Sequence, residues 1–438
     1  MKKVLIIGNG AREHVIAETL LRSSHQTSVI TYGSATNPGL LQLSTAYEVG
    51  SLSDFDNLKD FANHTKPDFA IMGPEAPIAA GMADMLLATG IKSASPLKVS
   101  GALESSKSFA RDLLQKYNIP GNPAFKVFYK SEGIREFMEK LGGNYVVKSD
   151  GLKGGKGVKV SGDHLETISD GVSYAEECLR EDGKVVVEEK FIGQEFSLMS
   201  FVDGKTVVSM PAVQDHKRAY DGDKGPNTGG MGTYSCADHS LPFLRPSDIQ
   251  DAHDINVQVT KALYEETGVY FTGIMYGGFI ACKDKVGLIE YNARFGDPEA
   301  MNVLPILKTD FVDICLATIE GSLDGMQIEF EKKATVCKYI VPEGYPDSPV
   351  KGEKIEIGSI PDGVKTYYAS VDQREDGLYL GGSRAIAFVG IADELDEAAA
   401  LATSAMDSVR GPVFYRKDIG TKELIQKKMD MMTGLRSC

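Results

Sequence analysis

The chain has 438 residues, of which 42% are hydrophobic and 25% charged, a composition typical of a globular protein with several domains. Its formal net charge of −14 argues against a nucleic-acid-binding surface, which needs clustered Lys and Arg. No apolar stretch reaches the length of a membrane span, and the run at 4–7 is too short for a signal-peptide core. These properties favour a cytoplasmic protein without nucleic-acid or membrane partners. Anionic small molecules remain possible ligands, because a local basic pocket can form in an acidic protein.

The first hundred residues alternate between strand and helix patterns. Apolar runs at 3–7, 28–31 and 69–72 predict strands, and the segments 11–21 and 83–87 carry helical spacing. This alternation is typical of a parallel α/β unit.

The middle of the chain predicts a second, mixed unit. A helix is expected over 105–117, ending before Pro120 because the residue preceding proline disfavours helical geometry. A second long helix is expected over 251–265, closed by Gly268. Strand patterns occur at 145–148, 156–160, 185–187, 196–202, 271–282 and 286–291, the last two as a hairpin.

From about residue 334 the pattern changes again. Short strands at 335–341, 364–371 and 385–389 precede one helix at 394–409, which predicts a separate α+β domain. The six cysteines are scattered without C-x-x-C or metal-ligand spacing, so we expect free thiols in a reducing cytosol.

A glycine-rich turn, Gly8-Asn9-Gly10-Ala11-Arg12-Glu13, follows the first strand and opens a helix. It lacks the third glycine of a dinucleotide fingerprint, and the second strand ends without the acidic residue that holds a ribose. An NAD site is therefore a minor alternative. A helix N-terminus beside Arg12 suits a phosphate, although a plain strand-to-helix turn explains the same residues.

The segment from Val147 to Val158 packs three lysines and four glycines between two apolar strands. Glycines let backbone amides approach phosphate oxygens closely, and lysines neutralise triphosphate charge. The Gly-Lys-Ser/Thr of a Walker A loop is absent, so this is a different phosphate loop. A solvated basic hairpin would not explain why Lys148 lies within the apolar run, and we favour triphosphate binding.

A third motif runs from Leu288 to Glu299. Alternation along a strand sends Glu290, Asn292 and Arg294 to one face. Carboxylate and amide oxygens are suitable ligands for Mg²⁺, and a guanidinium binds anions such as phosphate. A cross-strand ion pair beside a solvated Asn is the simpler interpretation of these three residues. The lysine–glycine loop upstream favours the metal and phosphate site over this alternative.

Together these segments resemble the ATP-grasp superfamily and, within it, the glycinamide ribonucleotide synthetase (phosphoribosylamine–glycine ligase) family. The resemblance covers nearly the whole chain, and Arg294-Phe295-Gly296-Asp297-Pro298-Glu299 matches the signature string of the family. The other matching strings are Gly8 to His14, Gly73 to Pro77, Lys148 to Val158, Gln214 to Arg218 and Gly225 to Gly232.

The resemblance implies a multidomain α/β and α+β fold with three parts. These are an N-terminal parallel α/β substrate-binding domain (1–102), a two-lobed ATP-grasp region (103–330, with a small mobile lobe at about 122–190) and a C-terminal α+β domain (331–438). Adenine nucleotide is expected between the lobes, held by residues that match the nucleotide motifs of the family. These residues are Lys107, Lys148, Gly154, Gly155, Lys156, Gly157, Glu188, Glu189, Phe191, Ile192 and Glu195.

The resemblance further implies ATP as co-substrate, with Mg²⁺ or Mn²⁺ held by Glu290 and Asn292. Glycine, activated as glycyl phosphate, is joined to phosphoribosylamine in de novo purine biosynthesis, with Arg294, Lys148 and Asp215 as catalytic residues. The expected substrate contacts are Gly10, Arg12, Glu13, Glu75, His216, Lys217, Arg218, Asn227, Thr228, Gly229, Gly230, Arg294 and Asp297. A structural role for His216 is an equal alternative. We expect a monomer or weak homodimer.

Three departures from the family pattern blur individual contacts, one of them at 32–39 after the second strand. The phosphate loop carries Lys153 where the family has an alanine-rich version, and Lys190 interrupts the adenine hinge. The open alternatives are an ATP-grasp carboxylase that uses bicarbonate and a nucleotide-binding scaffold without turnover.

Overall fold

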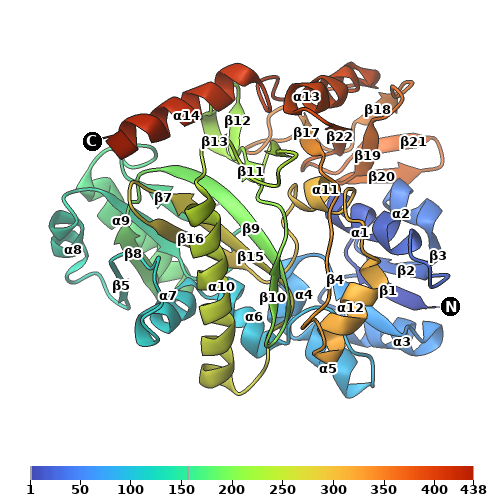
Figure 1. Cartoon of the computed structure of the whole chain (residues 1–438), viewed down its shortest axis with the longest axis horizontal. Helices are drawn as coiled ribbons and strands as arrows, with labels where there is room; N and C mark the ends of the chain where they lie inside the picture. The colour runs from blue at the N-terminus through green and yellow to red at the C-terminus, as the bar shows by residue number, and fades with distance from the viewer. Residues whose placement is uncertain (1, 155–156, 438) are drawn as a thin grey trace.

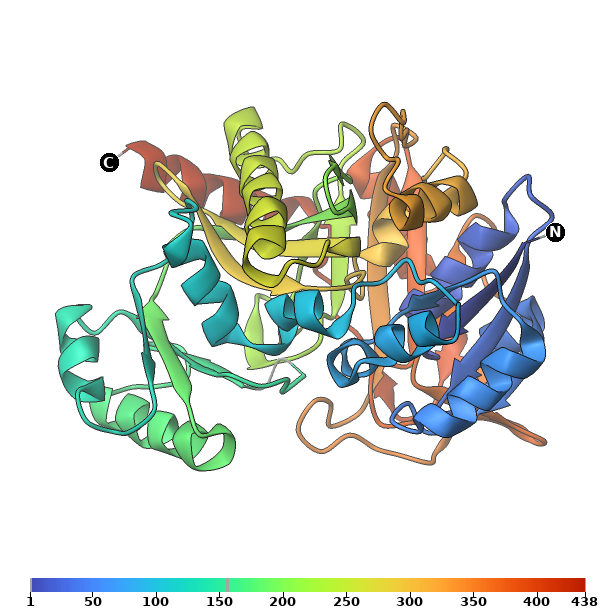
Figure 2. The same cartoon turned by 90° about the horizontal axis from the view of Figure 1, so that it is seen from below.

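The computed structural model of the chain describes residues 2–154 and 157–437. The N-terminal segment lies at one end of the molecule and the segment 122–190 at the other, in both views (Figures 1 and 2). The predicted phosphate-loop residues Gly155 and Lys156 lie outside the described residues.

The N-terminal part is a parallel sheet in the order β3-β2-β1-β4, with helices around it. Gly8, between β1 and α1, has φ +118°, and a Cβ there would lie 2.7 Å from Pro74 Cδ, so this turn requires glycine. The elements are β1 Lys3–Ile7, α1 Ala11–Leu21, β2 Ser28–Gly33, α2 Pro38–Leu43, β3 Ser44–Val49, α3 Phe55–Thr65, β4 Phe69–Met72, α4 Glu75–Ala80 and α5 Met82–Ala88.

The helix expected over 105–117 is confirmed as α7 (Lys107–Lys116), which begins two residues later than expected. A further helix, α6 (Lys98–Ser105), precedes it, and the two are separated by Ser106 in an extended conformation. The Ser106 hydroxyl accepts a hydrogen bond from the amide of Phe109 at 3.2 Å and so caps α7. The break places Lys107 at the first position of a new helix.

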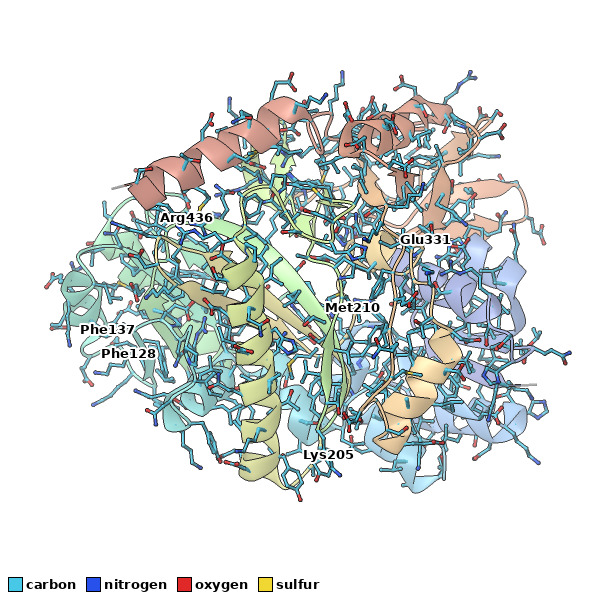
Figure 3. The ribbon with its side chains drawn as sticks, viewed as in Figure 1. Phe128, Phe137, Lys205, Met210, Glu331 and Arg436 are labelled. Carbon is cyan, nitrogen blue, oxygen red and sulfur yellow. The ribbon has the colours of Figure 1, made fainter. Side chains whose placement is uncertain are left out.

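The segment 122–190 forms a small lobe of four strands in the order β5-β8-β6-β7, backed by two helices. Its own apolar core includes the Phe128 and Phe137 rings, whose centroids lie 6.0 Å apart (Figure 3). The elements are β5 Phe125–Phe128, α8 Ile134–Lys140, β6 Tyr145–Ser149, β7 Val158–Val160, α9 Ile168–Asp182 and β8 Val185–Glu189.

A second antiparallel sheet, in the order β10-β9-β15-β16, lies between the two ends, and α10 packs against it (Figure 1). The predicted hairpin is confirmed as β15 and β16. The elements are β9 Gln194–Asp203, β10 Val207–Ser209, β12 Arg218–Tyr220, β13 Lys224–Asn227, α10 Pro246–Thr267, β15 Thr272–Ala281, β16 Val286–Asn292, α11 Ala300–Val303 and α12 Phe311–Glu320.

The C-terminal part shares a sheet with the preceding region. Strands β11 and β14 join the order β11-β14-β17-β22-β19, and β24 pairs with β17. A smaller sheet has the order β20-β21-β18-β23. The elements are β11 Gln214–Asp215, β14 Gly232–Ser235, β17 Ala334–Pro342, β18 Lys354–Ile357, β19 Lys365–Tyr368, β20 Val371–Arg374, β21 Gly377–Leu380, β22 Ile386–Ala392, α13 Leu395–Ser404, the 3₁₀ turn Met406–Ser408, β23 Val409–Arg410, β24 Val413–Phe414 and α14 Lys422–Ser437.

The expectation of one C-terminal helix is wrong, because α14 follows α13. Helix α14 runs back over the central region, where Arg436 pairs with Asp248 at 2.6 Å (Figures 1 and 3). None of the described helices is long and apolar enough to cross a membrane. The mixed α/β multidomain fold is confirmed, whereas the domain boundaries stay a prediction.

Candidate active site

A cavity of about 720 Å³ lies where the three parts of the chain meet. Its walls come from the first turns of α1 and α4, from α7, from the small lobe, and from β16. Arg384, in the loop before β22, and Lys428, on α14, complete the lining. The cavity therefore draws side chains from both ends of the sequence.

Lys148 lies on β6 of the small lobe and lines this cavity. Its ammonium pairs with Glu188 at 2.5 Å and donates to the carbonyl of Ile289 at 2.7 Å. Arg111 donates two hydrogen bonds, of 2.7 and 3.0 Å, to the same carboxylate. It also donates one of 2.8 Å to the Ile289 carbonyl. Burial lowers the pKa of Lys148, against the opposing effect of Glu188. The network joins the small lobe to β16.

A β-bulge explains why the Ile289 carbonyl is available. Opposite β15, Gly278 pairs with Glu290 and Phe279 with Leu288, so Ile289 is the extra residue. Its carbonyl turns to Lys148 and Arg111. Because the bulge precedes Glu290, the alternation from Glu290 onward is kept.

Lys107 is positioned by the break before α7. Its ammonium donates to the Gly151 carbonyl at 2.7 Å. Asp150 accepts a hydrogen bond from the Ser108 amide at 2.6 Å and pairs with Lys184 at 2.9 Å. The start of the predicted phosphate loop is thus tied to the N-terminus of α7.

Glu290, Asn292 and Arg294 all line the cavity, as the predicted shared face requires. Although burial opposes it, Lys217 and Lys148 lower the pKa of Glu290, which favours its charged form. The Asn292 amide oxygen accepts from Arg294 at 3.0 Å. Glu290 and Asn292 supply the hard oxygen donors that Mg²⁺ and Mn²⁺ prefer, so this pair fits a divalent cation.

Arg294 is held by two carboxylates from other elements. It pairs with Glu104 at 3.0 Å and with Glu75 at 3.6 Å. Burial raises the pKa of Glu104, and Arg294 counteracts this. The guanidinium is therefore fixed beside Asn292.

Asp215, which is half-buried, and Glu299, which is buried, carry neighbouring carboxyl groups. Burial and the neighbouring Glu299 raise the pKa of Asp215 well above its usual range. Burial also raises the pKa of Glu299, whose carboxylate accepts from Tyr276 at 2.8 Å. A cation bound between them would relieve this cost.

Most predicted site residues are brought to the cavity wall. They are Arg12, Glu75, Lys107, Lys148, Gly154, Glu188, Glu189, Phe191, Ile192, Glu195, Asp215, His216, Lys217, Arg218, Asn227, Thr228, Gly229, Glu290, Asn292, Arg294 and Asp297. His216 Nδ1 lies 3.2 Å from the Gly232 carbonyl, and its Nε2 is buried with no hydrogen-bond partner among the described residues.

Four predicted contacts do not line the wall as described: Gly10, Glu13, Gly157 and Gly230. The Glu13 carboxylate folds back onto the Gly10 amide and onto Arg12, at 2.7 Å from its Nε, and so caps α1. The Gly157 carbonyl accepts from the Ser149 amide in the turn between β6 and β7.

Several lining residues were missed by sequence reasoning: Glu104, Arg111, Tyr276, Glu299, Arg384 and Lys428. Glu299 stands within the signature string, so a signal for it existed. Arg111 lies on the polar-looking side of a helix, and its buried partners come from two distant strands.

Models of three families match the chain in order. They are the N domain of phosphoribosylglycinamide synthetase over residues 2–104, its ATP-grasp (A) domain over 105–300 and its C domain over 335–422. Proteins named phosphoribosylamine–glycine ligase from Methanosarcina barkeri and Methanocaldococcus jannaschii are 47% and 46% identical to the chain. Each alignment covers 99% of this chain and 100% of the relative.

Solved structures agree with this result. Phosphoribosylamine–glycine ligase from Thermotoga maritima superposes with a TM-score of 0.79 at 29% identity, covering 95% of this chain and 100% of that one. The biotin carboxylase domain of 2-oxoglutarate carboxylase from Hydrogenobacter thermophilus gives a TM-score of 0.72 at 16% identity, covering 99% and 94%. The second likeness shows a shared fold alone and does not favour the carboxylase alternative.

Proposed function

The chain belongs to the phosphoribosylglycinamide synthetase family, and we propose how its cavity joins glycine to phosphoribosylamine with the conversion of ATP to ADP. The reaction is an ATP-dependent, ADP-forming ligation in purine biosynthesis. The observation that carries the proposal is convergence: Lys107 and Lys148 reach the cavity from one side, and the Glu290 to Arg294 segment reaches it from the other.

ATP lies between the small lobe and β16 in this proposal. Lys107 and Lys148 meet its phosphates, and residues 188–192 hold the adenine edge. The Glu188 carboxylate is committed to Arg111 and Lys148, so it acts on the nucleotide through Lys148. Glu195, near Lys217 at 3.6 Å, is placed to meet the ribose.

Glu290 and Asn292 would hold Mg²⁺ or Mn²⁺ beside the terminal phosphates. A divalent cation supplies charge neutralisation at phosphate oxygens when it is bound. Lys217 lies 3.8 Å from Glu290. Although burial alone would lower its pKa, Glu195 and Glu290 raise the pKa of Lys217, so it stays charged.

The chemistry begins with activation of a carboxylate. A glycine carboxylate oxygen forms a bond to the γ-phosphorus as the bond to ADP breaks, which gives glycyl phosphate. The nitrogen of phosphoribosylamine then attacks the carbonyl carbon, the carbon–oxygen bond to phosphate breaks, and the nitrogen loses a proton. Arg294 and Lys148 stabilise the charge that develops on the transferred group.

We assign the glycine ammonium to the Asp215–Glu299 pair. Burial raises the pKa of both carboxyl groups, and Glu299 raises that of Asp215 further, so a cation bound between them favours their ionised forms. The assignment places glycine between this pair and Arg294. We assign Arg12 and Glu75, which lie near Arg294, to the binding of the phosphoribosyl substrate.

We also propose that the protein is cytoplasmic, because the phosphorylated substrates do not cross membranes unaided. We further propose that it is a monomer or a weak homodimer. Analytical ultracentrifugation at micromolar concentration tests the oligomeric state.

The function itself is tested by ADP release from purified protein with Mg-ATP and glycine, with and without phosphoribosylamine. Stoichiometric ADP and glycinamide ribonucleotide only when both substrates are present support it, whereas ADP formation with a different carboxylate overturns the substrate assignment.

A further inference from the structure

Arg384 belongs to none of the sequence motifs that mark the site. It lies in the loop between β21 and β22 of the C-terminal part, and it lines the cavity. Its side chain is only 15% exposed. A buried arginine needs a specific set of partners, because an unpaired buried charge is costly.

The partners of Arg384 come from two separate loops of the active site. Its Nη1 donates to the carbonyls of Gly229 at 2.6 Å and Gly230 at 3.1 Å, in the glycine-rich segment before β14. The same nitrogen donates to the carbonyl of Asp297 at 2.8 Å, in the signature string. Nη2 lies 3.2 Å from the Asp297 carboxylate. One side chain thus ties both loops together.

Tyr339, on β17, completes this arrangement. The Arg384 guanidinium lies 4.6 Å from the centre of its ring, and its hydroxyl donates to Asp297 Oδ1 at 2.6 Å. Both side-chain contacts use Oδ1. Asp297 Oδ2 points instead toward the N-terminal loop, 3.9 Å from where a Cβ would lie at Gly10. The carboxylate is therefore oriented with one oxygen held and the other turned to the substrate side.

The Gly229–Gly230 turn is also tightly packed against Asp215 and Pro298. Gly230 has φ +107°, and a Cβ there would lie 2.6 Å from Asp215 Oδ1 and from Pro298 Cδ. A shift of this turn would move Asp215 and the Asp297 loop together. Asp215 is one of the two carboxylates to which we assign the glycine ammonium.

We propose that Arg384 is a positioning residue that holds the Gly229–Gly230 turn and the Asp297 loop in the geometry needed to bind glycine and the acceptor amine. It touches no nucleotide-binding residue among its described partners. The planar guanidinium is required, because a lysine ammonium cannot reach three carbonyls and a carboxylate while stacked on a ring. The inference rests on the proposed function.

The test compares Arg384→Ala, Arg384→Lys and Tyr339→Phe with the wild type. The matched control is Arg374→Ala, because Arg374 is an exposed arginine of the same domain that also stacks on a tyrosine, at 4.2 Å from the Tyr379 ring centre. Three readouts are needed: kcat and KM for glycine in the full ligation assay, ADP affinity by calorimetry, and rescue of activity by added methylguanidinium.

For Arg384→Ala we expect kcat/KM for glycine to fall by about 100-fold, the loss typical of a small misplacement at a reacting centre. ADP affinity should stay within about twofold, and methylguanidinium should restore part of the turnover in this variant only. Arg384→Lys should remain at least about tenfold impaired, and Tyr339→Phe should show a smaller loss of the same kind.

Two outcomes overturn the proposal. One is glycine kinetics for Arg384→Ala that match those of Arg374→Ala. The other is an equal loss of glycine turnover and ADP affinity without rescue, which indicates general misfolding. If the wild type itself fails to ligate glycine, the proposed function fails instead, so the two failures are distinguishable.

Discussion

At the scale of single residues, the site consists of buried charges that hold one another in place. Glu188 lies between Arg111 and Lys148, and Arg294 lies between Glu75 and Glu104. Such arrangements are stable only when complete, because removal of one partner leaves a buried charge unpaired. They also fix the cations that face the phosphates before substrate binds, which is what electrostatic stabilisation of a transition state requires.

Replacement of Arg294 tests the charge that we assign to phosphoryl transfer. Arg294→Ala should lower the ligation rate by about 100- to 1,000-fold, the cost of removing one preorganised group that stabilises developing charge. ADP affinity should change little, because we assign the binding of the nucleotide phosphates to Lys107 and Lys148. Steady-state kinetics and calorimetry measure the two quantities.

Arg294→Ala leaves the buried carboxylate of Glu104 without its ion-pair partner, and a double variant controls for this effect. Glu104→Gln combined with Arg294→Ala removes that buried charge and should restore stability without restoring turnover. Recovery of turnover in the double variant would refute a direct role for Arg294.

At the scale of elements, the site depends on two irregularities. The extended residue Ser106 starts α7 at Lys107, and the bulge at Ile289 frees the carbonyl that Lys148 and Arg111 share. Neither feature was predicted. Propensity and periodicity identify the strands on both sides, whereas a single capping residue and a single extra residue depend on partners that are distant in sequence.

The interpretation of the motifs was more successful than that of the irregular elements. The predicted grouping of Lys148, Glu290 and Asn292 succeeded because apolar runs identify the strands β6 and β16 that carry them, and Arg294 follows directly after β16. Helix α14 carried a signal that was overlooked, since its buried residues Leu424, Ile425, Lys428 and Met432 follow helical spacing. Arg384 carried none, because its partners are backbone carbonyls of other loops.

The cap that ties the small lobe to α7 can be tested at Asp150. Asp150→Ala removes the acceptor for the Ser108 amide and the partner of Lys184, at a cost of about 1–2 kcal/mol. The KM for ATP should rise by about tenfold, because Lys107 and the phosphate loop lose their shared anchor.

Asp54→Ala is the matched control for this variant. Asp54 caps α3 by accepting from the Asn57 amide at 3.1 Å, and it does not line the cavity. It should lose comparable stability and keep the wild-type KM for ATP. Equal KM values in both variants would contradict the role of Asp150.

At the scale of the whole molecule, the ends of the chain are joined through the site. Strand β14 pairs with β17, which carries Tyr339, and Arg384 binds the loops that follow β13 and β16. On the opposite side, His14 on α1 packs between Tyr367 and Tyr368 of the C-terminal part. Its Nδ1 accepts a hydrogen bond from the Tyr368 amide at 3.1 Å.

This junction predicts a loss of stability in acid. Burial lowers the pKa of His14 to about 4 from 6.5, although Glu18 opposes the shift. Between these values the unfolded chain binds more protons than the folded one, so stability falls as the pH falls. The full effect is about 3 kcal/mol, measurable by urea denaturation between pH 7.5 and 4.

The variant His14→Asn should be less stable at neutral pH and should show a shallower decline toward acid. An unchanged slope in His14→Asn would refute the assignment.

Oxygen transfer from glycine to phosphate tests the central claim most directly. Glycine labelled with ¹⁸O in both carboxylate oxygens is supplied with Mg-ATP and phosphoribosylamine, and the released phosphate is analysed by mass spectrometry. The glycyl phosphate route predicts one ¹⁸O in each phosphate and one in the amide of the product. Unlabelled phosphate alongside labelled product would contradict activation of the glycine carboxylate by ATP in this site.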